Sequence, residues 1–180
     1  LWPDSLTIVL KKRDSLPPNV TAGLDTVAVR MPASREARGF IRACGVPLAA
    51  PSANKSGRPS PTSVLQVAED MDGRLPVILS GRNCRVGIES TVLDLTGEAP
   101  VVLRPGIVSA ASIERVLSKR VVYLKEDAPS AKLNSPGLRY RHYAPCCEMA
   151  LNLDGDREKI FARYREAVQA GKNPVLLCGM

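Results

Sequence analysis

Short runs of β-branched and aliphatic residues recur along the first 124 residues, and each run is closed by proline, glycine, serine or a charged residue. Runs of this length and composition are typical of strands with at least one buried face. They predict strands at Leu6–Leu10, Asp25–Met31, Val46–Ala50, Leu75–Leu79, Ser90–Leu95, Val101–Leu103 and Val121–Leu124. The turn at Thr96–Glu98 has the spacing of a hairpin, so the two strands on either side of it are expected to pair.

Helices are expected between several of these strands. Three segments begin with a serine or threonine that can cap a helix: Ser34 to Cys44, Thr62 to Met71, and Ser109 to Ser118. Gly45 suits the position just beyond the first helix, where the backbone often turns left-handed. Strands that alternate with helices in this way predict an α/β fold.

The composition narrows the class of partner. The 180 residues are 44% hydrophobic but only 4% aromatic, so the core must be mainly aliphatic. A net charge of +7 favours an anionic partner such as a nucleotide, RNA or an acidic metabolite, although a basic surface without a role has the same composition. Five cysteines and one histidine, without metal-ligand spacing, disfavour zinc and favour reduced thiols in the cytoplasm. No run is long enough to span a membrane.

Composition changes after residue 124. Lys125–Pro145 has several proline, serine and basic residues and little apolar periodicity, which predicts a linker. The following segment predicts a β-α-β unit made of Glu148–Leu153, Arg157–Ala170 and Pro174–Cys178. We therefore expect three parts: a main domain at 1–124, a linker at 125–145, and the start of a Rossmann-like domain at 146–180.

The segment Pro47–Ser60 is the first candidate for a binding site. Its small residues let a backbone approach a ligand closely, and its serines and Asn54 supply short donors and acceptors. Lys55 and Arg58 add positive charge beside it, which favours an anion. The same residue types are also expected in an ordinary connection between a strand and a helix.

Three other positions stand out. Thr26, Ala28 and Arg30 share one face of a predicted strand, and the fork of an arginine suits a carboxylate, although an arginine at a sheet edge can also be ordinary surface. Glu89, Ser90 and Thr91 begin another strand, where they can bind a ligand or cap a turn. Arg104 ends the next strand, which makes it a plausible neighbour of Ser90 across the hairpin.

No combination of nucleophile, base and acid is visible in the sequence. It has no G-x-S-x-G, Walker or H-E-x-x-H motif, and its one histidine lies in the predicted linker. Chemistry in the main domain is therefore expected to depend on positioning and on charge stabilisation.

Five segments in order resemble the bacterial and archaeal threonylcarbamoyl-AMP synthases: TVAVRMP, PLAAPSANKSGRPSPT, GIESTVLDL, LRPG and SPGLRYRHYAP. The resemblance covers essentially residues 1–145. It implies a YrdC-type twisted mixed sheet with helices, then a linker and a Rossmann-like C-terminal domain. It also implies a reaction in which L-threonine, bicarbonate and ATP give threonylcarbamoyl-AMP and pyrophosphate.

The resemblance also implies roles for individual residues. Arg30, the Ala50 backbone and Ser90 would hold L-threonine, and Thr26, Ser52, Ser60 and Arg104 would contact ATP. Asn54 would support its loop. The linker would fold over the site, with Tyr143, or less favourably Tyr140, reaching the nucleotide. Magnesium is the expected counter-ion of the triphosphate.

The family implies partners as well. The product would feed threonylcarbamoyl modification of tRNA adenosine by a downstream transfer machinery, and contact with tRNA or double-stranded RNA is an associated expectation. The family's N-terminal segment, which carries a threonine-rich motif and a Lys-x-Arg phosphate-binding motif, is not recognised ahead of the matched segments in this sequence. We therefore expect a piece of a longer enzyme that is inactive alone. An RNA-binding module without chemistry and a carbamoyl-adenylating relative are the alternatives.

Overall fold

The computed structural model describes residues 1–124 and 147–177. The chain divides into two compact units, one of residues 1–144 and one of residues 145–180, and each is described by itself. The predicted boundaries at 124 and 145 stay predictions. Tyr140, Tyr143 and the whole predicted linker lie outside the described residues.

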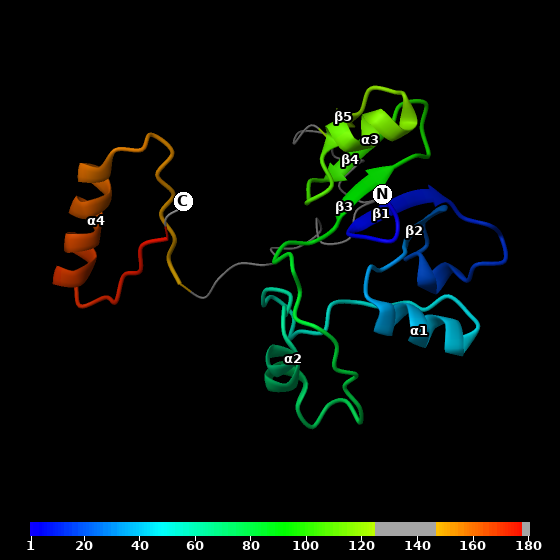
Figure 1. Ribbon diagram of the computed structural model, residues 1–180, viewed down its shortest axis with the longest axis horizontal. Coiled ribbons are helices and arrows are strands. Elements are labelled where there is room, and N and C mark those ends of the chain that lie inside the picture. Colours follow the sequence, from blue (N-terminus) through cyan, green and yellow to red (C-terminus); the bar gives the residue numbers. More distant parts are fainter. Residues whose placement is uncertain (125–146, 178–180) are drawn as a thin grey trace. The chain divides into compact units, whose positions relative to one another are not determined.

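The first unit is built on a five-stranded mixed sheet (Figure 1). Its strands are β1 (Leu6–Lys11), β2 (Thr26–Arg30), β3 (Thr91–Asp94), β4 (Val101–Arg104) and β5 (Val122–Tyr123), in the spatial order β2-β1-β3-β4-β5. β1 runs antiparallel to β2 and parallel to β3, while β4 is antiparallel to β3 and parallel to β5. The α/β fold with a mixed sheet is therefore confirmed, and β3 and β4 form the predicted antiparallel pair.

Aliphatic side chains form two buried clusters in this unit. One contains Leu6, Leu93, Val102, Ile113 and Val121, and the other contains Val9, Val92 and Leu103. Successive residues of β3 and β4 fall into different clusters because side chains alternate between the two faces of a strand. Helix α3 (Ala110–Leu117) contributes Ile113 to the first cluster. Each fully buried aliphatic side chain contributes about 1.5–3 kcal/mol.

The helix ends follow the predicted caps with one correction. In α1 (Arg35–Cys44) the Ser34 hydroxyl accepts from the Ala37 amide at 3.1 Å, and Gly45 follows with φ of 70°. Ser109 caps α3 as predicted. In α2 (Val64–Met71), however, the cap is Ser63 and not Thr62. The reason is a capping box: Ser63 accepts from the Gln66 amide, and the Gln66 side chain accepts from the Ser63 amide.

Two predicted strands of the first unit are wrong. Val46–Ala50 and Leu75–Leu79 are irregular, and β5 is shorter than the predicted Val121–Leu124. A strand needs a hydrogen-bonded neighbour, and within residues 1–124 neither segment has one. Val77 is 77% exposed, so the apolar run at Leu75–Leu79 is not a buried strand. A short 3₁₀ turn at Pro18–Val20 completes the unit.

The described part of the second unit contains α4 (Arg157–Gln169), whose start is capped by Asp156. The predicted helix is confirmed to within one residue. The flanking strands are wrong as far as the structure describes them, because residues 148–153 and 174–177 are irregular and Cys178 lies outside. Leu151 is 81% exposed, so these runs are apolar without being buried. None of the helices in the described ranges has the length and hydropathy of a membrane span.

Candidate functional site

Polar side chains from four adjacent strands meet at one edge of the sheet. This edge is the row of strand ends where β1 and β3 begin and β2 and β4 end, because β1 and β3 run in one direction and β2 and β4 run in the opposite one. Arg30 ends β2, Ser90 directly precedes β3, and Arg104 ends β4. The mixed sheet thus brings three of the predicted site residues to the same edge.

Ser90 and Arg104 are in direct contact, as their positions in the hairpin predicted. The Arg104 guanidinium donates to the Ser90 carbonyl from Nε at 3.1 Å and from Nη2 at 3.0 Å. Nη2 also donates to the Ser90 hydroxyl at 3.2 Å. Ser90 is only 5% exposed, whereas Arg104 is half-buried. Two donors on one carbonyl fix the guanidinium plane, so these hydrogen bonds hold the positive charge of Arg104 in one position at the sheet edge.

Thr7 connects this pair to Arg30. Its hydroxyl lies 2.7 Å from the Ser90 hydroxyl, and the residue pairs with Arg30 across β1 and β2. Arg30 itself is exposed, and its guanidinium donates to the Asp4 carbonyl and the Ser5 hydroxyl, each at 3.4 Å. These are long hydrogen bonds, which a carboxylate can replace with shorter, charge-assisted ones. Thr7 was not among the predicted site residues.

A close backbone approach supports the same edge. A Cβ at Gly106 would collide with the Thr91 amide nitrogen and would lie 2.7 Å from the Glu89 carbonyl oxygen. Only glycine lets the turn after β4 come this near to the segment that contains Ser90. The Thr91 hydroxyl holds the approach in place, because it donates to the Val108 carbonyl at 2.9 Å and accepts from the Val108 amide at 3.1 Å.

Thr26 lies elsewhere. It begins β2 and pairs with Lys11, four residues away from Arg30. Four residues of strand span about 13 Å. Thr26, Ala28 and Arg30 do share one face as predicted, but a site that includes both Thr26 and Arg30 must extend along β2.

The loop with Ala50, Ser52 and Ser60 is organised separately, by an aspartate. Asp70 near the end of α2 is 6% exposed, and its carboxylate accepts from the Lys55 amide at 3.0 Å and from the Arg58 guanidinium at 2.5 Å. The Lys55 amide is the largest cause that keeps the pKa of Asp70 below its ordinary value, and the positive charge of Arg58 adds to it. Ala50 and Ser52 are exposed and Ser60 is half-buried, so all three remain within reach of a ligand.

The structure changes the interpretation of Arg58. The sequence placed its positive charge beside a candidate anion site, but its guanidinium is bound to Asp70 and lies 3.9 Å from Glu69. Asp70 was missed because its local sequence gives only a weak signal. The one available signal is an acidic residue three positions after Val67, on the helix face that turns inward.

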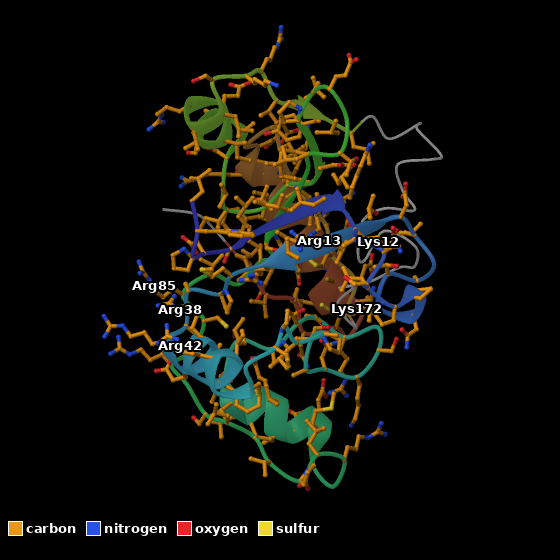
Figure 2. The ribbon with its side chains drawn as sticks, turned by 90° about the vertical axis from the view of Figure 1, so that its right-hand side faces the viewer. Lys12, Arg13, Arg38, Arg42, Arg85 and Lys172 are labelled. Carbon is orange, nitrogen blue, oxygen red and sulfur yellow. The ribbon has the colours of Figure 1, made fainter. Side chains whose placement is uncertain are left out.

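Basic residues are distributed over more than one region. In Figure 2, Arg38, Arg42 and Arg85 lie well apart from Lys12 and Arg13. Arg38 is also occupied, since it donates to the carbonyls of Pro32 and Ala33, each at 2.9 Å. Among the residues that the structure describes, these basic side chains therefore do not form one continuous patch.

Comparison with known proteins gives a consistent set of relatives. Residues 1–106 match the model of the Sua5/YciO/YrdC family, described as "Telomere recombination", and residues 108–179 match "Threonylcarbamoyl-AMP synthase, C-terminal domain". The threonylcarbamoyl-AMP synthase of Pyrococcus abyssi is 46% identical over 93% of this chain and 49% of its own length. That of Bacillus subtilis is 45% identical over 95% of this chain and 49% of its own length.

A solved structure agrees with these matches. The crystal structure of P. abyssi Sua5 complexed with L-threonine superposes with a TM-score of 0.82 at 43% identity, over 94% of this chain and 51% of that one. This chain thus spans about half the length of the relatives that it matches.

Proposed function

This chain belongs to the threonylcarbamoyl-AMP synthase family, and on that basis we propose that it forms the threonine- and nucleotide-binding part of an L-threonylcarbamoyladenylate synthase. In the proposed reaction the amine of L-threonine is carboxylated by bicarbonate with loss of water. An oxygen of this carbamate then attacks the α-phosphorus of ATP, and pyrophosphate leaves. The product is threonylcarbamoyl-AMP, a donor for modification of tRNA by downstream enzymes.

The cluster at the sheet edge supports this proposal most strongly. Arg30 presents a guanidinium fork to the carboxylate of L-threonine, and its present hydrogen bonds at 3.4 Å are weak enough to be exchanged. The Ser90 hydroxyl, held between Thr7 and Arg104, has an orientation fixed before a substrate arrives. The Ala50 backbone would complete the threonine site. Arg104 would neutralise charge on the nucleotide beside it.

ATP would extend from this edge along residues that lie farther away. Thr26, Ser52 and Ser60 would contact it, and Tyr143 would reach it from the part of the chain that is not described. The separation between Thr26 and Arg30 of about 13 Å suits a pair of substrates that together are this long. Because the reaction joins two bound substrates without a protein nucleophile, the work of the site is alignment and charge neutralisation.

Magnesium would be held by the triphosphate rather than by a preformed protein site. In residues 1–124 and 147–177, no group of three or more His, Cys, Asp or Glu side chains is arranged to bind a metal ion. The ion would enter with ATP and supply positive charge to the phosphates. Bicarbonate, tRNA contact and a cytoplasmic location belong to the same proposal.

Ligand-dependent thermal unfolding tests this function. L-threonine and ATP with magnesium should each raise the melting temperature of this chain, because a ligand stabilises the state that binds it. Arg104→Ala should abolish most of the shift caused by ATP, and L-valine, which lacks the hydroxyl of L-threonine, should have little effect. Carbamoyl phosphate in place of L-threonine would identify the carbamoyl-adenylating relative. Absence of any shift with both L-threonine and ATP would contradict the proposal.

The RNA-binding module is the second candidate. The net charge of +7 favours it, but the separated basic residues of Figure 2 do not form one track. Binding of double-stranded RNA that weakens steeply with salt and is unaffected by ATP would support this alternative.

A further inference from the structure

The loop between α1 and α2 is held in one conformation by contacts from two sides. From within the loop, the Asn54 side-chain amide donates to the carbonyls of Lys55 at 2.9 Å and Arg58 at 3.0 Å. The Arg58 amide also donates to the Lys55 carbonyl at 3.1 Å, which closes a tight turn. Gly57 occupies this turn with φ of 87°, a conformation that favours glycine.

Asp70 supplies the contact from outside the loop. Its carboxylate is used at both oxygens: Oδ2 accepts from the Lys55 amide at 3.0 Å and Oδ1 accepts from the Arg58 guanidinium at 2.5 Å. Asp70 stands in the last turn of α2, and the first turn of the same helix is fixed by the capping box of Ser63 and Gln66. Helix α2 thus anchors the loop at two places: at Lys55 and Arg58 through Asp70, and just beyond Ser60 through the cap at Ser63.

Charge makes this arrangement compatible with an anionic ligand. A carboxylate on its own beside a phosphate site would repel the ligand, but the guanidinium of Arg58 offsets the charge of Asp70. The same contact removes Arg58 from competition as a direct phosphate ligand. What the loop then offers a ligand is its backbone and the hydroxyls of Ser52 and Ser60, at positions set by the anchor.

We infer that Asp70 is a positioning residue for nucleotide binding: through the Lys55 amide and the Arg58 guanidinium it holds the loop in the conformation that places Ser52 and Ser60 against ATP. This inference rests on the proposed function. It assigns to Asp70 no contact with the substrate. It also assigns Arg58 to the loop anchor and not to the phosphates.

Calorimetric titration of this chain with ATP and magnesium tests the inference, with Asp70→Asn as the variant. Loss of a charged acceptor from two donors should weaken ATP binding about tenfold. Glu69→Gln is the matched control. It removes the same charge from the neighbouring residue, whose side chain is 76% exposed. It should change ATP affinity less than twofold. L-threonine affinity should fall much less than ATP affinity in Asp70→Asn, since Arg30 and Ser90 lie outside the loop and only the Ala50 backbone of the threonine site lies within it.

Amide hydrogen exchange supplies an independent readout. The Lys55 amide should exchange at least about tenfold faster in Asp70→Asn than in the original chain and in Glu69→Gln, because its acceptor has been altered. Asp70→Glu, which keeps the carboxylate, should restore part of both the protection and the ATP affinity. It also serves as the test variant if Asp70→Asn does not fold.

The outcomes separate the possible explanations. If Arg58 is a direct phosphate ligand, Asp70→Asn releases it and ATP binds as well or more tightly, which overturns the inference. Equal losses of ATP and L-threonine affinity would show a general loss of structure and also overturn it, as would faster Lys55 exchange without a change in ATP affinity. If the original chain binds no ATP, the proposed function itself fails.

Discussion

The contact between Gly106 and the segment before β3 gives the sharpest prediction about stability. A methyl group in Gly106→Ala would meet the Thr91 amide nitrogen, the Glu89 carbonyl oxygen at 2.7 Å and the Ser90 carbonyl carbon at 2.8 Å. All three are backbone atoms, so no flexible side chain can move aside. Relief requires a shift of the backbone, which is tied by the Thr91 amide to the Ser5 carbonyl at 3.0 Å.

The magnitude follows from these contacts. Overpacking a close-fitting site costs about 1–3 kcal/mol, and alanine returns about 0.4–1 kcal/mol by restricting the unfolded chain. Gly106→Ala should therefore lower the free energy of unfolding by about 1.3 kcal/mol at the middle of these ranges, and by at most about 2.6 kcal/mol, with a lower urea midpoint. Fluorescence of Trp2, the single tryptophan, reports on this unit because its indole N–H donates to the Leu6 carbonyl at 2.8 Å. L-threonine affinity should fall as well, since Ser90 is displaced.

Gly97→Ala is the control for the same substitution. The nearest atom to a Cβ at Gly97 is the Ala99 carbonyl oxygen at 4.0 Å, which is ordinary contact. This variant should unfold at the same urea concentration as the original chain or slightly above it. If Gly106→Ala behaves like Gly97→Ala, the close approach does not constrain the site and the reasoning is refuted.

Three further changes should have measurable effects. Thr7→Val removes the hydroxyl that lies 2.7 Å from Ser90 but keeps the shape, so L-threonine binding should weaken several-fold by calorimetry with little loss of secondary structure; unchanged affinity would remove Thr7 from the site. Ser63→Ala breaks the capping box of α2 and should cost about 1 kcal/mol in urea unfolding, whereas no loss would contradict the observed cap. The Lys55 amide, followed by the charge of Arg58, lowers the pKa of Asp70, so its contribution to stability is complete above the ordinary value of 3.8 and is lost as pH falls through the lowered pKa. Asp70→Asn should remove this part of the acid dependence of unfolding, and an identical pH profile in the variant would contradict it.

Sequence patterns predicted best where the cause is local. The Ser34 cap, the left-handed Gly45 and the Ser109 cap all depend on neighbours within four residues, and all are confirmed. Thr62 was wrong by one position because two adjacent residues can both cap. The Gln66 side chain accepts from both backbone amides, but it is the Ser63 hydroxyl that accepts from the Gln66 amide.

Strands and site contacts were predicted less well because they depend on distant partners. Leu75–Leu79 has the composition of a strand, yet no neighbouring strand pairs with it in residues 1–124. The Thr7 hydroxyl meets Ser90 across 83 residues of sequence, and Asp70 reaches Lys55 across 15. Such contacts follow from strand order and helix placement, which the spacing of apolar residues does not determine.

Some site residues were predicted from their positions in strands, and others from the family resemblance. Arg30 and the Ser90–Arg104 pair were selected from strand position, and the structure brings these residues to one sheet edge. The roles of Thr26, Ser52 and Ser60 came only from the family resemblance. Their places in the structure are compatible with contact to a long ligand, and their roles stay predictions.

The proposed binding site of L-threonine lies at the edge formed by the ends of β2 and β4 and the starts of β1 and β3. Amide chemical shifts of this chain, followed by NMR during titration with L-threonine, test it most directly. We expect saturable shifts at residues 5–7, 29–31 and 89–91, and their loss in Arg30→Ala with the rest of the spectrum unchanged. Saturable shifts confined to residues 147–177, or no shifts at millimolar L-threonine, would contradict it.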